Sequence, residues 1–499
     1  MWLSGPFVKG GVFLSLPSAL VTFLYLSNIV AALSLLFVRK SDTATTLAWL
    51  LVFVFLPYIG FILYFFFGSR AKYKIMTRRY SLSRDSLGKI PFTPSTPTEL
   101  LNDEARQNLD LININTNGAG SVYTQDNFCE LLPSAREKYD RMFAEIDAAR
   151  QSVNVLYFII KTHDKSGRDL ISLLAKKARE GVKVRLIYDT FGYIRARRSD
   201  FRELIEAGGM VYGYLPSFLR TALEANYRMH RKIVVIDGRV AYTGGINIGD
   251  DYLGLDLVRT PWRDTSIRIT GPAVRDVQLR FVEDWVYIDR QTHLLDRKSS
   301  IETANELSLL FPPLEKTGNM GVQIISSGPD SEESYTRDSY QRMISTADRY
   351  VYIQTPYFVP DEALLHTLRL AAHAGIDVRV MIPGIPDKKF VYYVTTSYIG
   401  ELLKSGIRVY VHAGFLHAKT FVLDDAVASI GTTNLDNRSF DLDFEINAMV
   451  FDRGFAVQCR DTFMRDIDDC VEMTAEQYKS RSRITRLREG FWRLVAPLV

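Results

Sequence analysis

The sequence predicts an α/β protein in which two similar α/β/α halves form a pseudo-dimer, preceded by an N-terminal transmembrane helical hairpin. Three observations lead to this prediction. A polar motif recurs at identical spacing in the segments 230–247 and 417–434. The segments 145–189 and 343–383 share an order of helix, strand, helix and strand. Two long stretches without a charged residue occur within the first 70 residues.

The N-terminal region, 1–70, is expected to anchor the chain in a membrane through two helices. Neither Val12 to Val38 nor Ala44 to Phe67 contains a charged residue. Each stretch exceeds the roughly 20 residues that an α-helix needs to span a bilayer. A cleaved signal peptide would account for the first stretch but not for the second, so the chain stays anchored in either case. A short polar connector makes the pair a hairpin.

Basic residues around the hairpin predict its orientation. Those that follow the second stretch outnumber Arg39 and Lys40 of the connector, and they are Arg70, Lys72, Lys74, Arg78 and Arg79. By the positive-inside rule the large domain then lies in the cytoplasm, although the two connector residues count against this. We therefore expect a multi-pass protein of the cell membrane.

The rest of the chain is expected to contain a linker and two halves. The segment 71–115 is polar, with Ser and Pro clusters such as TPSTPTEL, and is predicted to be a linker with little packed structure. The halves are expected at 116–320 and 321–499, with one of the two polar motifs in each. Alternating strands and helices predict mixed, largely parallel sheets with helices outside.

The C-terminal segment YKSRSRITRLREGFWRLVAPLV mixes six basic residues with apolar ones. A basic amphipathic segment of this kind can lie on an anionic membrane surface. It can equally be a charged helix that packs its apolar side on the domain. The sequence leaves both interpretations open.

The amino-acid composition limits the classes of protein to which the chain can belong. The chain of 499 residues is 47% hydrophobic, which fits a large core together with a membrane segment. A net charge of +4 requires no polyanionic partner. The three cysteines, Cys129, Cys459 and Cys470, show no paired or zinc-like spacing and fit a reducing compartment.

The repeated motif carries the candidate chemistry. Its first copy, HRKIVVIDGRVAYTGGIN, contains His230, Lys232, Asp237, Gly244 and Asn247. The run IVVI predicts a strand, and residues two apart on a strand share a face, so the histidine and the lysine point the same way. The aspartate has the opposite parity and begins a predicted Asp-Gly turn, so we count it with the catalytic set in a supporting role.

The second copy, HAKTFVLDDAVASIGTTN, places His417, Lys419, Asp424, Gly431 and Asn434 at the same offsets. Two facing copies would form a cage of two imidazoles and two fixed cations. Lysines and asparagine amides, the latter Asn247 and Asn434, can hold phosphate oxygens. One histidine can attack phosphorus while the other protonates the leaving alkoxide. Such a cage suits a phosphodiester and requires no metal or cofactor.

The duplicated motif resembles the His-x-Lys-x-x-x-x-Asp signature of the phospholipase D superfamily. The segments 243–254, 261–274 and 431–448, and the apolar segment 45–68, are similar to bacterial cardiolipin synthases. This resemblance implies two phospholipase D-like halves around one active site. It also implies that a carboxylate downstream of each motif hydrogen-bonds the catalytic histidine, and Asp264 and Glu445 occupy these places.

The resemblance further implies transfer of a phosphatidyl group from one phosphatidylglycerol to another, giving cardiolipin and glycerol through a phosphohistidine. It favours His230 as the nucleophile and His417 as the acid and base. The expected partners are phosphatidylglycerol and cardiolipin in the membrane and an anionic lipid surface, and no nucleic acid. A hydrolytic phospholipase D, a membrane-tethered nuclease and a non-catalytic scaffold remain alternatives, and phosphatidylethanolamine remains an alternative donor. The oligomeric state is not predicted.

Overall fold

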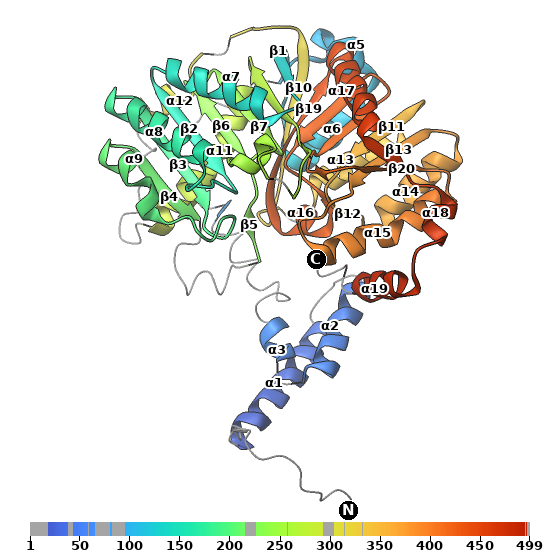
Figure 1. Ribbon diagram of the computed structural model, residues 1–499. Coiled ribbons are helices and arrows are strands. Elements are labelled where there is room, and N and C mark those ends of the chain that lie inside the picture. Colours follow the sequence, from blue (N-terminus) through green and yellow to red (C-terminus); the bar gives the residue numbers. More distant parts are fainter. Residues whose placement is uncertain are drawn as a thin grey trace, which may run out of the picture. The chain divides into compact units, whose positions relative to one another are not determined.

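A computed structural model of the chain describes residues 18–37, 43–57, 59–64, 80–81, 95–214, 226–256, 258–292, 304–313, 315–331, 333–494 and 496. Contacts between residues divide the chain into two units, 1–70 and 71–497. The elements of both are labelled in Figure 1.

The first unit contains the described helices α1 (Ser18–Phe37), α2 (Thr43–Phe55) and α3 (Gly60–Leu63). The α1 and α2 helices pack through apolar side chains, among them Leu35 and Phe53. Asn28 Nδ2 donates a hydrogen bond to the backbone oxygen of Phe53 at 2.9 Å. Within the described residues, none of the helices combines the length and the apolar character needed to cross a membrane. The ends of both predicted spans, the connector residues Arg39 and Lys40 and the basic residues 70–79 lie outside the described residues.

The prediction of an unpacked linker over 71–115 is wrong for its described second part. A short η2 turn (Thr98–Leu100), α5 (Asp103–Gln107) and the start of α6 (Leu109–Ala119) lie there. Asn102 caps α5 by accepting a hydrogen bond from the backbone N–H of Ala105 at 2.9 Å. Leu111 and Ile112 are buried in a core of the second unit, so apolar residues within the polar stretch are enough to dock it.

The second unit is built on one large mixed sheet. In the first half its strands are β1 (Tyr123–Leu132), β2 (Ser152–Tyr157), β3 (Lys183–Asp189), β4 (Met210–Tyr214), β6 (Ile233–Ile236), β7 (Val240–Gly244) and β9 (Ser266–Thr270). In the second half they are β10 (Met320–Ser327), β11 (Tyr350–Gln354), β13 (Asp377–Pro383), β14 (Arg408–His412), β16 (Thr420–Leu423), β17 (Val427–Gly431), β19 (Asp443–Phe451) and β20 (Cys470–Glu472).

Strand order repeats from one half to the other. The sequence β4-β3-β2-β6-β7-β9-β1 in the first half mirrors β14-β13-β11-β16-β17-β19-β10 in the second. The halves join where β1 changes partners, because its first residues pair with β10 and its last with β9. The change occurs at an irregularity around Asp126, which has a positive φ of 67°.

The expectation of largely parallel sheets is wrong. Within the large sheet, the parallel strand pairs along its main order are β2–β3–β4 and β11–β13–β14. The strands of each polar motif are joined by three-residue loops, 237–239 and 424–426, which are too short for anything but antiparallel pairing. These hairpins and the strands beside them make the centre of the sheet antiparallel.

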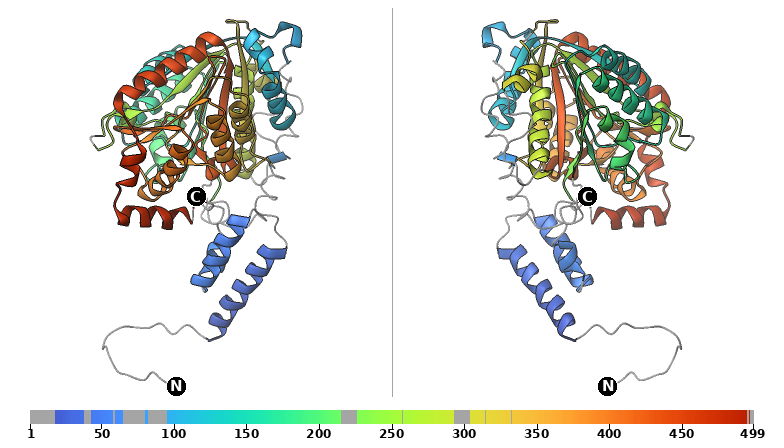
Figure 2. Two further views of the ribbon diagram at one scale, coloured as in Figure 1. Left: turned by 90° about the vertical axis from the view of Figure 1, so that its right-hand side faces the viewer. Right: turned by 90° about the vertical axis from the view of Figure 1, so that its left-hand side faces the viewer.

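Helices cover both faces of the sheet (Figures 1 and 2). In the first half they are α7 (Ala135–Ala148), α8 (Lys165–Arg179), α9 (Arg202–Glu206), α11 (Val274–Thr292) and α12 (Ala304–Leu310). In the second half they are α13 (Tyr335–Ser345), α14 (Glu362–His373), α15 (Lys389–Lys404), α16 (Asn437–Asp441), α17 (Arg453–Asp466), α18 (Ala475–Lys479) and α19 (Arg483–Arg493). The predicted repeat of helix, strand, helix and strand is confirmed as α7–β2–α8–β3 and α13–β11–α14–β13.

Three buried apolar clusters hold the second unit together. One lies under α7, α8 and α9, and a second lies under α13, α14 and α15. The third contains residues of both halves, including Trp285 of α11, Ile324 of β10 and Phe463 of α17. The two halves therefore share a core, and this core fixes the position of one motif relative to the other.

Candidate active site

Each polar motif forms a β-hairpin whose first strand begins directly after the lysine. The turns contain Asp237 and Gly238 in one copy and Asp424 and Asp425 in the other, and all four residues have φ between 51° and 64°. Positive φ at both central residues defines the turn type that Asp-Gly favours. The predicted strands and turns are confirmed, and the histidine and lysine of each motif lie in the extended segment before the strand.

A short parallel ladder between the halves brings the first histidine to a carboxylate of the second half. The strand β5 (Arg228–Met229) pairs with the beginning of β19, where Met229 stands opposite Phe444. Because the pairing is parallel, the next residues on the two strands, His230 and Glu445, come side by side.

The second histidine reaches the first half in the same way. The strand β15 (Phe415–Leu416) pairs in parallel with β8 (Trp262–Arg263), where Leu416 stands opposite Arg263. The ladder continues as the backbone N–H of His417 donates to the carbonyl of Arg263 at 2.7 Å. His417 therefore lies beside Asp264.

Both histidines donate Nδ1–H to the carboxylate of the opposite half. His230 Nδ1 lies 2.9 Å and 3.0 Å from the two carboxylate oxygens of Glu445, and His417 Nδ1 lies 2.7 Å from Asp264 Oδ2. These bonds leave Nε2 of each ring as the nitrogen that carries the lone pair. The hydrogen bonds expected for Asp264 and Glu445 are present, and the structure adds that each one crosses from one half to the other.

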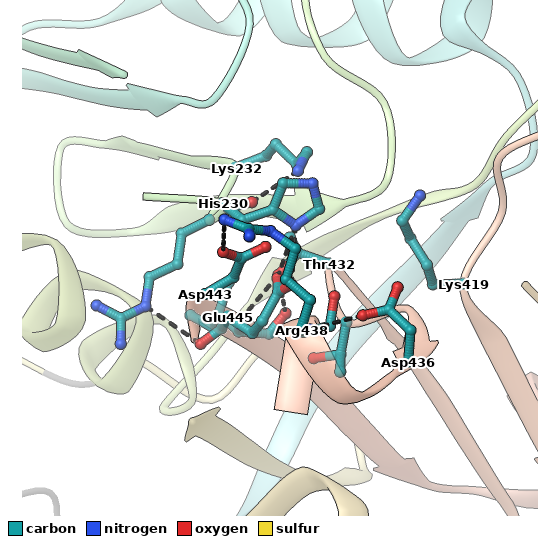
Figure 3. Close-up of polar contacts among 12 residues, drawn as sticks. His230, Lys232, Lys419, Thr432, Asp436, Arg438, Asp443 and Glu445 are labelled. Atoms are coloured by element: carbon teal, nitrogen blue, oxygen red, sulfur yellow. Dashed lines mark hydrogen bonds and ion pairs between the residues drawn. The ribbon is translucent and has the colours of Figure 1, made fainter. Parts of the chain in front are cut away.

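The two lysines are buried in the same cluster. Lys232 Nζ donates to the backbone oxygen of His230 at 2.6 Å, and Lys419 Nζ donates to that of His417 at 2.5 Å. Burial lowers the pKa of Lys232 to about 7 and that of Lys419 to about 8. Each ammonium uses one donor in this bond and keeps others for an anion. In Figure 3, Lys232 lies above the ring of His230 and Lys419 lies to the right of both.

Charges from both halves act on each imidazole. Burial, together with the nearby ammonium groups, lowers the pKa of both rings, that of His417 to about 4. The ammonium of Lys419, in the second half, lowers the pKa of His230, and that of Lys232, in the first half, lowers the pKa of His417. The four side chains therefore form one electrostatic cluster, in which the neutral form of each ring is favoured.

The two carboxylates are supported differently. Thr432 Oγ1 donates to Glu445 Oε2, and burial raises the pKa of Glu445 to about 7. At the corresponding position of the first motif, a Cβ on Gly245 would lie 2.1 Å from Asp264 Oδ1. Asp264 Oδ1 instead accepts the backbone N–H of Thr265 at 2.7 Å. The difference between the motif copies thus follows from how closely each carboxylate approaches the backbone.

Arg231, between the histidine and lysine of the first motif, points away from the cluster and is 1% exposed. Its Nε donates to the backbone oxygen of Glu445 at 3.1 Å, and its guanidinium also binds Asp284 and Ser326. Tyr80 donates to the same Asp284 carboxylate. This network holds the strand that carries Glu445, and nothing in the motif spacing indicated it.

Asp237 and Asp424, which we counted with the catalytic set, lie outside the cluster. The Asp237 carboxylate accepts the backbone N–H groups of residues 150–152 at 2.7–2.9 Å. Asp424 accepts those of residues 348–350 at 2.7–2.9 Å. They directly follow β6 and β16, so they lie at the turn end of each hairpin, where they fix the start of β2 and of β11. The prediction of a catalytic role is therefore wrong for both aspartates, and their role is structural.

The two asparagines differ. Asn247 Oδ1 accepts the backbone N–H of Ile159 at 3.2 Å, and its Nδ2 donates to Tyr252 Oη at 2.7 Å, so its amide is engaged within the protein. Asn434 is 5% exposed, and its Oδ1 has no hydrogen-bond partner among the described residues. The amide of Asn247 is already bound within the protein, which weakens the case for this residue as a phosphate ligand.

Further polar groups lie close to Lys419. Asp436, which caps α16 by accepting the N–H of Ser439 at 2.7 Å, and Asp387, which accepts a hydrogen bond from Tyr357, both raise the pKa of this lysine. Burial raises the pKa of Asp436 itself to about 7. Asp436 lies in the segment 431–448, whose family resemblance could have singled it out, whereas Asp387 lies in a loop without a sequence signal.

Among the residues that the structure describes, no group of three or more His, Cys, Asp or Glu side chains has the arrangement of a metal site. Metal-free chemistry stays a prediction that an activity measurement must test.

Comparison with known proteins places the chain in a family. A family model described as cardiolipin synthase, PLD-like domain, matches residues 142–261 and 340–467, once in each half. A model described as phospholipase D-nuclease N-terminal matches residues 26–69.

Curated relatives align over almost the whole chain. The chain is 40% identical over 493 residues to the major cardiolipin synthase ClsA of Bacillus subtilis (strain 168), covering 97% of this chain and 100% of the relative. It is 37% identical over 487 residues to the cardiolipin synthase of Listeria monocytogenes serotype 4b (strain CLIP80459), covering 96% and 99%.

Among solved structures, the phosphatidylserine synthase of Haemophilus influenzae Rd KW20 aligns with 80% of this chain and 100% of its own, with a TM-score of 0.58 at 16% identity. This likeness shows a shared phospholipase D-like fold and confirms the two α/β halves. The identity of 37–40% to curated cardiolipin synthases over nearly the full length of both chains shows that the chain belongs to the cardiolipin synthase family of the phospholipase D superfamily.

Proposed function

We propose that this protein is a cardiolipin synthase that transfers the phosphatidyl group of one phosphatidylglycerol to another, giving cardiolipin and glycerol. The observation that carries the proposal is the pair of crossed histidine–carboxylate hydrogen bonds, with a buried lysine beside each ring. Family membership supports the same reaction, since curated relatives of this length are named cardiolipin synthases.

In the first half-reaction, Nε2 of His230 attacks the phosphorus of phosphatidylglycerol and forms an N–P bond. The bond from phosphorus to the glycerol oxygen breaks, and His417 gives its Nε2 proton to that oxygen, so glycerol leaves. Lys232, Lys419 and the amide of Asn434 bind the non-bridging oxygens, where charge develops in the transition state.

In the second half-reaction, the headgroup hydroxyl of another phosphatidylglycerol attacks the phosphohistidine. His417 takes the hydroxyl proton, the new P–O bond forms and the N–P bond breaks, which releases cardiolipin and regenerates neutral His230. Glu445 and Asp264 hold the rings in the required tautomer and stabilise positive charge on them.

The protonation states follow from the electrostatics. Lowered pKa values keep the ring of His230 neutral, which is the nucleophilic form. His417 must carry a proton when it acts as the acid. The substrate phosphodiester brings a negative charge beside the ring, and a nearby negative charge raises the pKa of an imidazole.

Membrane anchorage is also part of the proposal. We infer that residues 1–70 form a membrane-spanning hairpin and that the catalytic halves, 116–320 and 321–499, lie on the cytoplasmic side of the cell membrane. The support is the absence of charge from Val12–Val38 and Ala44–Phe67, the excess of basic residues after the second stretch and the match to an N-terminal family model.

Product analysis tests the proposed reaction. Purified protein is mixed with labelled phosphatidylglycerol vesicles and a chelator, and lipids and glycerol are quantified by mass spectrometry. Cardiolipin with equal release of glycerol supports the synthase and its metal independence. Phosphatidic acid as the sole product would identify a hydrolase. No turnover would move the search to phosphatidylethanolamine as donor or to nucleic acid.

Variants connect the reaction to the site. His230→Ala and His417→Ala should each abolish turnover, whereas the exposed His366 of α14 provides a matched control as His366→Ala. Substantial cardiolipin formation by either of the first two variants would contradict a site shared between the halves.

A further inference from the structure

The C-terminal helix α19 presents an apolar stripe to solvent. Ile484, Leu487, Phe491 and Leu494 are 63%, 75%, 59% and 63% exposed. Their spacing of three, four and three residues places them on one side of an α-helix. We call these four side chains the apolar stripe. Large apolar side chains gathered on one exposed face are a common feature of interaction surfaces.

The other side of α19 fixes the helix to the domain. Glu489, 4% exposed, accepts a hydrogen bond from Thr396 of α15 at 2.9 Å. The ring of Trp492 lies 5.6 Å from that of Phe390, also in α15. The sequence left open whether the apolar residues of this segment face the domain. The structure shows that Trp492 does and that the apolar stripe does not.

The charges around the apolar stripe are all basic. At about 100° of rotation per residue, Arg483 and Arg488 flank the stripe on its two sides, and both are exposed. The acidic residue of the helix, Glu489, points inward. Apolar side chains bordered by arginines match the interface of an anionic bilayer, where acyl chains lie beneath negatively charged phosphates.

The helix is connected to the surroundings of the active site through α15. The first turn of α15 contains Phe390, which contacts Trp492, and begins shortly after Asp387. Asp387 accepts a hydrogen bond from Tyr357, and its charge raises the pKa of Lys419. A surface that holds α19 would therefore also hold the end of α15 that lies near Lys419.

We propose that α19 is an interfacial helix that docks the catalytic domain on an anionic lipid surface. The apolar stripe inserts among the headgroups, and the flanking arginines bind lipid phosphates. The proposal names a lipid-binding surface outside the active site, and only its activity readout rests on the proposed function.

A probe attached to the apolar stripe tests docking directly. In the full-length protein with Cys470→Ala, Leu487→Cys is labelled with a polarity-sensitive fluorophore and reconstituted into vesicles with lipid-borne quenchers. Leu370→Cys is the matched control, because Leu370 is a 55% exposed leucine on α14. We expect quenching at 487 that increases with the phosphatidylglycerol content and decreases with salt. Equal quenching at 487 and 370, or no quenching at 487, would overturn the proposal.

Activity provides the second readout. Leu487→Asp with Phe491→Asp should lower turnover of vesicular phosphatidylglycerol by about tenfold or more, because the stripe no longer partitions into the interface. Turnover of a monomeric short-chain phosphatidylglycerol should stay within about twofold, since the active site is unchanged. Leu370→Asp is the control.

The outcomes separate the two proposals. Wild-type rates of the double variant on vesicles, or equal losses on both substrates with an unchanged melting temperature, would overturn docking through α19. Failure of the wild-type protein to turn over either substrate would instead refute the proposed function, and the probe at position 487 would still decide the docking.

Discussion

Replacing Glu445 by glutamine should slow formation of the phosphohistidine while the fold is preserved. Glu445 is fully buried, and both of its carboxylate oxygens lie within 3.0 Å of His230 Nδ1. Glutamine has nearly the same shape, and its amide oxygen can still accept the Nδ1–H. The substitution therefore removes the negative charge that stabilises His230 as it becomes positively charged during attack.

The magnitude follows from the bond that changes. A hydrogen bond to a charged group contributes about 1.5–3 kcal/mol, against about 0.5–1.5 kcal/mol for a neutral one. A bond that is lost completely in the transition state would slow the step roughly 10- to 150-fold, since about 1.4 kcal/mol corresponds to a factor of ten. Because glutamine keeps a neutral bond, the net loss is about 1–1.5 kcal/mol, and we expect a decrease of about tenfold.

Single-turnover kinetics measure this step. Excess enzyme is mixed with labelled phosphatidylglycerol, and glycerol release is followed in a rapid-quench instrument. Glu472→Gln, which alters a surface carboxylate paired with Arg408, is the control and should react like the wild type. A Glu445→Gln enzyme that releases glycerol within threefold of the wild-type rate would refute the assigned role of this carboxylate.

Three further predictions concern pH and stability. The value of kcat/KM should fall as pH rises through about 7 to 8, because Lys232 and Lys419 lose their charge there, and a limb above pH 10 would contradict this. Thr432→Val removes a hydrogen bond that lowers the pKa of Glu445. The acid limb of the pH–rate profile should therefore move to higher pH, and an unchanged limb would contradict a role for this hydrogen bond. Asp237→Asn should cost about 1–3 kcal/mol of stability in thermal melts while kcat is unchanged, since it weakens hydrogen bonds to backbone N–H groups, and a lower kcat at equal stability would return Asp237 to the catalytic set.

The parts of the site that depend only on residues close in sequence could be predicted from the local sequence pattern. The β-branched run after Lys232 predicts β6, and Asp237-Gly238 predicts its turn, because strand periodicity and turn chemistry are encoded within a few residues. The same parity argument separates Asp237 from His230 and Lys232, although the predicted catalytic set includes all three.

The pairing of each histidine with a carboxylate of the other half could not be predicted from the spacing of the motif residues. His230 and Glu445 are 215 positions apart, and their contact depends on the short ladder between β5 and β19. The family resemblance indicated that Glu445 and Asp264 bind histidines, but not that each binds the histidine of the other half. Arg231 was missed for the same reason, since its partners come from distant elements.

Tertiary packing also determines how two peripheral segments, residues 95–115 and α19, lie on the domain. Residues 95–115 have a polar composition typical of a linker, yet a few apolar side chains bury α5 and α6 against the second half. In α19 the amphipathic pattern showed that one face is apolar, but only the positions of Trp492 and Glu489 show which face meets the domain.

The most direct test of the account is to trap the covalent intermediate. Full-length enzyme is mixed with phosphatidylglycerol labelled in its phosphate, denatured at alkaline pH within the first turnover, digested and analysed by mass spectrometry. The account predicts a phosphatidyl adduct on the peptide that contains His230, and none when Asn replaces His230. An adduct on His417, or cardiolipin formation at the wild-type rate with no adduct at any point of the first turnover, would contradict it.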